Sequence, residues 1–254
     1  MSLVIFAHSN QVKHQRWLFN CVLKTLLKSF AVFFLVFANL ALAAPKQVTL
    51  HYQATRNGKP FANITETYQQ NGDQYVLESV TEGVGIVALF GKRILKSEGL
   101  ITADGLQPKH FELHQGDNEK KALYADFDWQ TNQLSMKNKG NVVTEVLLKG
   151  TQDISSFPYQ WMQMPPKGDE VNLPITTGKK LRTYNYKIAE RDVVLAVEAG
   201  QFKTLHLVNA SLDGKGNEKE FWLATEQFYL PVKIIQRDES GNVIEQTLTS
   251  MQIE

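Results

Sequence analysis

The residues that most resemble a metal-binding set are His110, Glu112 and His114. On a helix, two histidines four residues apart could share one ion. Here they alternate with Phe111 and Leu113, which is typical of a β-strand that exposes one face. Strand residues rise by about 3.3 Å each, so the two histidines would stand roughly 13 Å apart, whereas zinc needs both ring nitrogens at about 2 Å. We therefore predict a solvated outer face and no metal site.

Catalytic groups are equally scarce. Asp126 and Asp128 share one face of a predicted strand and Phe127 and Trp129 the other, so outward alternation accounts for this carboxylate pair. The sequence has no Gly-x-Ser-x-Gly motif, and its single cysteine, Cys21, lies in the N-terminal leader described below. We therefore expect a non-enzymatic protein. A hydrolase of an envelope polymer that uses scattered carboxylates, such as Asp126 and Asp128, is the least favoured alternative.

A glycine motif at residues 83–88, Gly-Val-Gly-Ile-Val-Ala, has the letters of a dinucleotide fingerprint after a predicted strand. That fingerprint needs a helix long enough to return the chain to a parallel strand. Gly91 and the alternating residues beyond it leave no room for such a crossover. We therefore expect no cofactor, and we interpret the glycines as a sharp turn with close backbone packing.

Residues 1–43 are predicted to be a signal peptide. They contain four basic residues and no acidic one, followed by an apolar run over residues 30–42. That run is shorter than the roughly 20 residues of a membrane-spanning helix, and it ends in Ala41-Leu42-Ala43, a small-x-small cleavage pattern. Cleavage after Ala43 would release residues 44–254 into the periplasm. Because the region before the apolar run is long, a later true start and an uncleaved inner-membrane anchor are both kept as alternatives.

The composition of the chain excludes several function classes. Its 254 residues are 43% apolar, which is ample for a sizeable core. With 27 Lys and Arg against 26 Asp and Glu, the charge balance gives no reason to expect nucleic-acid binding. The predicted mature chain is slightly acidic and has no cysteine, so it cannot form an internal disulfide. Ala44 stands where a lipoprotein would need a lipid-bearing cysteine.

The predicted mature chain is dominated by alternating apolar and polar residues, interrupted by turn dipeptides such as Asn57-Gly58 and Lys139-Gly140. One apolar face, for example, is formed by Leu123, Ala125 and Phe127. The pattern predicts an all-β fold with one or two short helices. We expect residues 44–254 to form a single domain, an antiparallel meander that closes into a barrel or curves strongly.

Two segments interrupt the alternation and are more apolar than surface loops. The first is residues 83–91, GVGIVALFG, and the second is residues 153–166, DISSFPYQWMQMPP. Each is predicted to form a short helix or loop across the mouth or inner face of the sheet. They would either act as plugs that complete the core, which is the favoured interpretation, or form an adaptable gate over an apolar cavity. The candidate ligand-binding residues in these segments are Val87, Leu89, Phe90, Phe157, Trp161 and Met162.

Trp222 is added to this candidate apolar pocket. It lies in a predicted strand whose other face carries Phe221 and Leu223, so both faces bear large apolar groups. Such a strand is expected to be buried on both sides, beneath a plug or beside a cavity.

The order of motifs resembles a proteobacterial periplasmic family known only as domain-of-unknown-function family 3108. The motifs are the 85–90 loop followed by Lys92 and Arg93, the Asp-Phe-Asp-Trp run at 126–129, and three segments at 200–204, 221–224 and 229–234. The resemblance covers nearly the whole predicted mature chain but implies no activity, cofactor or catalytic residue. The sequence departs from the family pattern around Trp161. A looser likeness is to periplasmic lipoprotein carriers, in which a curved sheet holds a helical plug.

Three function hypotheses follow. The leading one is a periplasmic binding or carrier protein whose curved sheet shelters an apolar or amphiphilic envelope ligand, such as a lipid. The second is an envelope interaction or scaffold protein, with an unknown protein partner and no small ligand, in which the two apolar segments simply fill the core. The third is the hydrolase named above.

Overall fold

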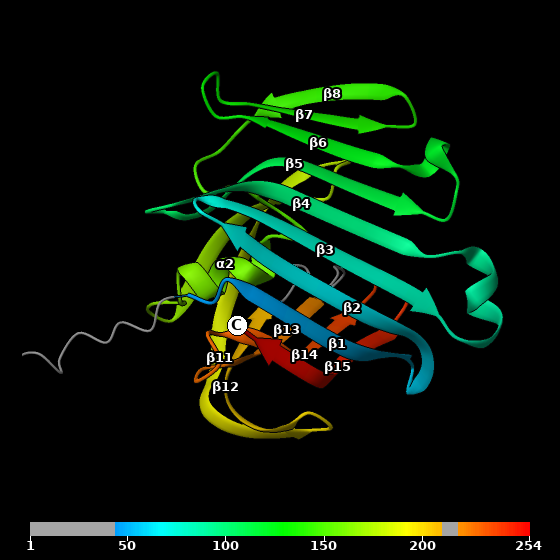
Figure 1. Cartoon of the computed structure of the whole chain (residues 1–254), viewed down its shortest axis with the longest axis vertical. Coiled ribbons are helices and arrows are strands. Elements are labelled where there is room, and N and C mark those ends of the chain that lie inside the picture. The colour runs from blue at the N-terminus through cyan, green and yellow to red at the C-terminus, as the bar shows by residue number, and fades with distance from the viewer. Residues whose placement is uncertain (1–43, 210–217) are drawn as a thin grey trace, which may run out of the picture. The chain divides into compact units, whose positions relative to one another are not determined.

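The computed structural model describes residues 44–209 and 218–254, so the predicted signal peptide at 1–43 lies outside the described residues. The described part folds into one 15-stranded sheet with three short helices (Figure 1). The strands are β1 (Gln47–Arg56), β2 (Lys59–Asn71), β3 (Gln74–Gly83), β4 (Arg93–Thr102), β5 (Gly105–Gln115), β6 (Leu123–Asp128), β7 (Gln133–Asn138), β8 (Asn141–Val146), β9 (Gln152–Asp153), β10 (Glu170–Thr176), β11 (Leu181–Val197), β12 (Gly200–Asn209), β13 (Glu218–Ala224), β14 (Leu230–Arg237) and β15 (Val243–Ile253). The helices are the 3-10 helices η2 (Gly85–Phe90) and η3 (Glu119–Lys121) and the α-helix α2 (Phe157–Gln163).

The sheet is a meander that curls without closing. From its centre, β1 to β8 follow one another in one direction, and β15 to β9 follow in the other. The two halves meet where β1 pairs with β15 in antiparallel register, from Val48 opposite Ile253 to Arg56 opposite Ile244. Strands β8 and β9 are the two ends, and only the short β9–β10 pair is parallel. The predicted all-β antiparallel meander is therefore confirmed, in its strongly curved form.

Turn chemistry places the strands in register. At Asn57-Gly58, both residues have positive φ, 50° and 77°, as a two-residue hairpin loop with right-handed strand twist requires. Lys139 and Gly140 repeat this arrangement, with φ of 51° and 81°, between β7 and β8. Because successive strand residues point to opposite faces, each correctly placed turn also fixes which side chains enter the interior.

The interior of the curl is filled by α2 and the residues before it. Figure 1 shows α2 between the two halves of the sheet. Its residues Phe157 to Met162 are buried. The helix is preceded by a turn in which the Asp153 carboxylate accepts hydrogen bonds from the amides of Ser155 and Ser156, both at 2.8 Å. Pro165 and Pro166 follow it and cannot continue a helix. The predicted plug at 153–166 is therefore present.

Gln160 is one of the residues that bind the plug to the sheet. Oε1 of Gln160 accepts a hydrogen bond from the Leu106 amide at 2.7 Å, and Nε2 donates to the Asp104 carbonyl at 3.1 Å. The amide of Gln160 lies so close to Gly105 that a Cβ on Gly105 would come within 2.4 Å of it. Gly105 also has φ of +94°, a conformation that L side chains rarely adopt.

We expect Gly105→Ala to lower the free energy of unfolding by at least about 2 kcal/mol, because positive φ alone costs about 1 to 2 kcal/mol and the Gln160 amide must also leave its two partners. Urea unfolding provides the measurement. Gly58→Ala is the matched control, since Gly58 has φ of +77° but an added Cβ would meet nothing within 4 Å. Equal losses in the two variants would show that Gln160 does not anchor the plug.

Candidate functional site

A cavity of about 150 Å³ opens between the two halves of the sheet. One wall is formed by β2, β3 and β4 and the other by β13, β14 and β15, while Ile154 to Pro158, at the start of the plug, lie between them. Apolar side chains from both walls line it, including Ile64, Leu95 and Phe221. A cavity of this size can hold a molecule as large as benzene, so only a small chemical group can enter fully.

Two cations face this cavity from opposite walls. Arg93 begins β4 and Lys219 lies in β13, and each is half-buried. Among the described residues, neither side chain has a carboxylate within 4.0 Å. Burial lowers the pKa of Arg93. Burial, with a smaller contribution from the Arg93 charge, lowers the pKa of Lys219 to about 8. Among the described residues, the two cations of the cavity therefore form no ion pair with a carboxylate.

The carboxylate of Glu66 also lines the cavity, but its described partners are hydroxyl groups. Tyr159 donates to Oε2 at 3.0 Å and Ser79 donates to Oε1 at 3.3 Å. Burial raises the pKa of Glu66, although the two hydroxyl hydrogen bonds oppose the shift. Both oxygens of Glu66 are therefore held in place by the plug and by β3, and this carboxylate does not pair with the cations.

A second interior carboxylate, Asp153, is the first residue of the plug and lies outside the cavity lining. It is fully buried, and in addition to its two amide bonds it accepts a hydrogen bond from the Ser97 hydroxyl at 2.6 Å. The hydroxyl groups of Ser97 and Tyr75 are 3.2 Å apart, which extends the network to β3. Burial raises the pKa of Asp153 to about 6 despite these hydrogen bonds. The group is a structural link between the plug and β4.

The predicted site residues in the plug have separate environments. Phe157 lines the cavity and lies with its ring centroid 5.6 Å from Nζ of Lys219. Trp161 and Met162 are buried in the filled interior, where Trp161 packs edge-on against Tyr186 at a centroid distance of 6.1 Å. Of these three residues, the cavity lining includes Phe157 alone.

The predicted insert at 83–91 does not complete the core, so the plug interpretation is wrong for this segment. It forms η2, in which Ile86, Leu89 and Phe90 are 77%, 83% and 69% exposed, while Val87 is half-buried. The reason is geometric. The 3-10 helix has only six residues and joins two paired strands, so it cannot turn back into the interior of the curl, and α2 already occupies that interior. Arg93, however, lies only three residues beyond η2 and lines the cavity.

The prediction that the Trp222 strand is buried on both faces is also wrong. Phe221 and Leu223 point into the core, whereas Trp222 lies half-buried on the outer face. There its ring stacks on His206 of the neighbouring strand at a centroid distance of 4.1 Å, and Lys233 lies 5.5 Å from the ring centroid. Cross-strand packing, rather than a plug, shields the indole.

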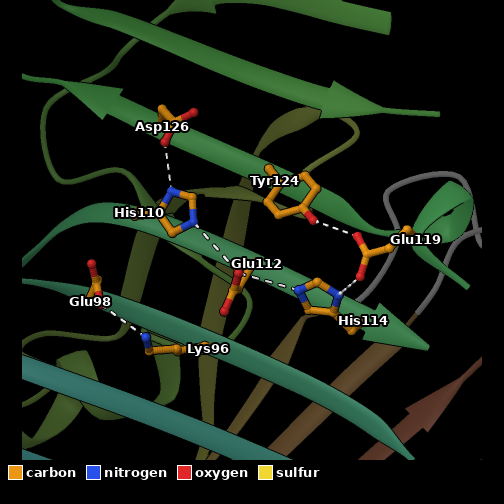
Figure 2. A network of polar contacts seen from close by, with 8 residues as sticks. All are labelled: Lys96, Glu98, His110, Glu112, His114, Glu119, Tyr124 and Asp126. Atoms are coloured by element: carbon orange, nitrogen blue, oxygen red, sulfur yellow. Dashed lines mark hydrogen bonds and ion pairs between the residues drawn. The ribbon is translucent and has the colours of Figure 1, made fainter. Parts of the chain in front are cut away.

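The histidines of β5 lie on the outer face as predicted, in a network that spans β4 to β6 (Figure 2). His110 contacts Asp126 at 2.7 Å, and His114 contacts Glu112 at 3.3 Å and Glu119 at 3.3 Å. Figure 2 shows that each ring is directed toward carboxylates and that both rings contact Glu112, whose Oε2 lies 3.3 Å from Nε2 of His114 and 4.0 Å from Nε2 of His110. Within residues 44–209 and 218–254, no group of three His, Cys, Asp or Glu side chains could hold a metal ion.

The predicted carboxylate pair has local structural roles. Asp126 is the partner of His110, and Asp128 accepts hydrogen bonds from the amides of Gln130 and Thr131 in the β6–β7 turn at 2.9 and 3.0 Å. The Thr131 hydrogen bonds lower the pKa of Asp128. Both side chains lie on the exposed face of β6, away from the cavity.

Sequence reasoning missed the three charged residues of the cavity. A signal was nevertheless present, because each occupies an inward position of an alternating strand: Glu66 shares a face with Ile64, Arg93 with Leu95, and Lys219 with Phe221. A charged residue among inward apolar neighbours marks either a buried network or a binding site.

The fold and the cavity together define a curled, barrel-like β-sheet protein with an internal helical plug. The chain belongs to the family described as "Protein of unknown function (DUF3108)", whose model matches residues 47–249. This confirms the family resemblance. Comparison with curated proteins gives no match.

One solved structure of similar shape supports the fold assignment. The chain is similar to a β-barrel-like protein of the domain of unknown function DUF1849 from Brucella abortus, at 14% identity and a TM-score of 0.53, over 84% of this chain and 99% of that one. A putative outer membrane lipoprotein-sorting protein domain from Vibrio parahaemolyticus aligns over 82% of this chain and 85% of that one, at 9% identity and a TM-score of 0.26. Only the first bears on the fold. In the described part of the chain, no helix has the length and hydropathy needed to span a bilayer.

Proposed function

We propose that the protein is exported to the periplasm and acts there as a non-enzymatic binding or carrier protein for an amphiphilic envelope ligand. The observation that carries the proposal is the cavity between the sheet halves, whose lining mixes apolar side chains with polar and charged ones, including two cations that form no ion pair with another described residue. An amphiphile has the matching pair of properties, a polar end and an apolar body. Ligand sites are typically concave and apolar with a few well-placed polar groups.

The volume of the cavity limits which end of the ligand can enter it. With about 150 Å³, the cavity receives the polar end and the first few carbon atoms. The apolar body then lies outside, where Leu89, Phe90 and Ile86 offer exposed apolar surface on η2, which ends three residues before Arg93 in the chain. Of the other residues predicted from the sequence to bind a ligand, Val87 and Phe157 also belong to this proposed site. Trp161 and Met162 lie in the core behind it and do not contact the ligand.

Native mass spectrometry of protein purified from the periplasm tests the proposal. We expect the mass of a chain that begins at Ala44, together with a bound species that is lost on delipidation. The delipidated protein should then bind dodecanol, and the Ile86→Ser, Leu89→Ser, Phe90→Ser triple variant should bind it at least about tenfold more weakly, because three exposed apolar contacts are lost.

A triple variant in β8, Val142→Ser, Val143→Ser, Val146→Ser, is the matched control, since these valines are 63%, 50% and 69% exposed on an edge strand. Dodecanol binding should be unchanged in this control. Protein that carries no small molecule and takes up no dodecanol would contradict the proposal. Retention of an envelope protein under those conditions would instead favour the interaction-protein alternative, for which the exposed valines of the β8 edge provide a pairing surface.

A further inference from the structure

The acidic and basic side chains that face the interior of the curl differ in how many hydrogen-bond or ion-pair partners they have. The interior carboxylates Glu66 and Asp153 each accept hydrogen bonds at both oxygens, from hydroxyl groups or backbone amides. The cavity cations Arg93 and Lys219 have no such partner among the described residues, and no ion pair joins either of them to Glu66. Within residues 44–209 and 218–254, the carboxylates therefore have partners in the fold, whereas neither cation has a carboxylate partner.

The two cations approach the cavity from strands that are far apart in the sheet. Arg93 pairs with Thr81 at the end of the β3–β4 ladder, and Lys219 pairs with Gln236 and Asn209 at the start of β13. Thr81 and Gln236 also line the cavity and add polar groups beside the cations. Curling of the sheet thus brings together two positive groups that lie more than 120 residues apart in the chain.

Two like charges in a partly desolvated space are unfavourable unless an anion lies between them. The Arg93 guanidinium offers a planar fork that fits two oxygens of a carboxylate or phosphate, and the Lys219 ammonium adds a compact point charge. The lowered pKa of Lys219 has the causes expected for such a site, which are burial and the Arg93 charge.

We propose that Arg93 and Lys219 bind the anionic head group, a carboxylate or a phosphate, of the amphiphile that the cavity receives. This inference rests on the proposed function, since it names the chemical class of the ligand for the same cavity. The anion lies between the guanidinium and the ammonium, with Phe157 beneath Lys219 and with apolar lining residues such as Leu95 and Phe221 beside its first carbon atoms.

The test compares four twelve-carbon ligands that differ only in the head group: dodecanoate, dodecyl phosphate, dodecanol and dodecyltrimethylammonium. Affinities of the delipidated full-length mature protein are measured by isothermal titration calorimetry below the micelle concentrations. We expect the two anions to bind at least tenfold more tightly than dodecanol, and the cation to bind most weakly. The ratio between dodecanoate and dodecyl phosphate then identifies which anionic head the site prefers.

Variants separate the role of the cations from general apolar binding. Arg93→Gln and Lys219→Gln should each weaken binding of the preferred anion at least tenfold and change dodecanol binding less than twofold. Lys96→Gln is the matched control, because Lys96 lies on the outer face of the same strand as Arg93 and pairs with Glu98 at 3.4 Å. This control should bind all four ligands as the unchanged protein does. Thermal unfolding of each variant checks that the fold is intact.

Failure of this inference is distinguishable from failure of the proposed function. Equal affinity for dodecanol, the anions and the cation would overturn the anion assignment while leaving a binding protein for amphiphiles. Anion affinity that survives both Gln substitutions would place the head group elsewhere and overturn the assignment of Arg93 and Lys219. Absence of binding for all four ligands would overturn both proposals. The ligand series on the unchanged protein gives its answer even if a variant unfolds.

Discussion

Trp161→Ala should lower the free energy of unfolding by about 3 to 5 kcal/mol, the range for removal of a buried aromatic side chain. The ring is 2% exposed and packs edge-on against Tyr186, which in turn stacks on Phe157 at a centroid distance of 6.0 Å. Its loss leaves a void at the centre of the curl, and the surrounding strands, which are paired to one another, cannot collapse into it. Urea unfolding followed by far-ultraviolet circular dichroism provides the measurement.

Trp222→Ala is the matched control for this prediction. The same side chain is removed, but from the half-buried outer face, so we expect a loss of less than half that of Trp161→Ala. If the two variants lost equal stability, the plug would contribute no more to the fold than a surface cross-strand contact. The pair of measurements therefore tests the placement of the plug inside the curl.

Asp153→Asn should remove a large part of the pH dependence of stability. In the folded protein the pKa of Asp153 is about 6, and its ordinary value is near 3.8. The folded state therefore holds this proton more tightly than the unfolded chain, so the stabilising contribution is present below about pH 4 and is lost as the pH rises to about 6. Two pKa units correspond to about 3 kcal/mol. Asparagine keeps an acceptor for the Ser155 and Ser156 amides but cannot ionise.

The measurement is urea unfolding of the unchanged protein and the variant at intervals from pH 4 to pH 7. From pH 4 to pH 7, the free energy of unfolding of the variant should rise by up to about 3 kcal/mol relative to that of the unchanged protein. Burial also raises the pKa of Glu66, but that group is present in both proteins and cancels. Asp73→Asn, at an exposed turn residue, is the control and should show no such movement. Parallel curves for Asp153→Asn would mean that Asp153 does not carry the proton.

Alternation and turn residues predicted the sheet well because both are local. Asn57-Gly58 and Lys139-Gly140 define their hairpins without reference to distant residues, and the short apolar segment around Trp161 had no place in the alternation except the interior. The same reasoning failed at η2 and at Trp222, because apolar character does not say whether a side chain is covered. Leu89 remains exposed, and Trp222 is covered by His206 on the outer face.

The charged part of the candidate site was beyond sequence reasoning for a different reason. Arg93 and Lys219 lie in β4 and β13 and become neighbours only through the curl of the sheet. The alternation of apolar and polar residues shows whether a side chain points into the curl. It does not show which strand lies on the opposite side of the interior. The inward direction of both residues could be predicted, but their shared cavity could not.

The β1–β15 pairing has a consequence for biosynthesis. Of the described strands, a ribosome makes β1 first and β15 last, so the ladder that unites the two halves of the sheet cannot form before β15 has been synthesised. Each half can assemble its own adjacent hairpins early, because those contacts are close in sequence, whereas the seam requires the slow search typical of distant pairings. The unfinished chain therefore stays open, with one edge of β1 unpaired, until the eleven residues of β15 are made and join the two halves of the sheet.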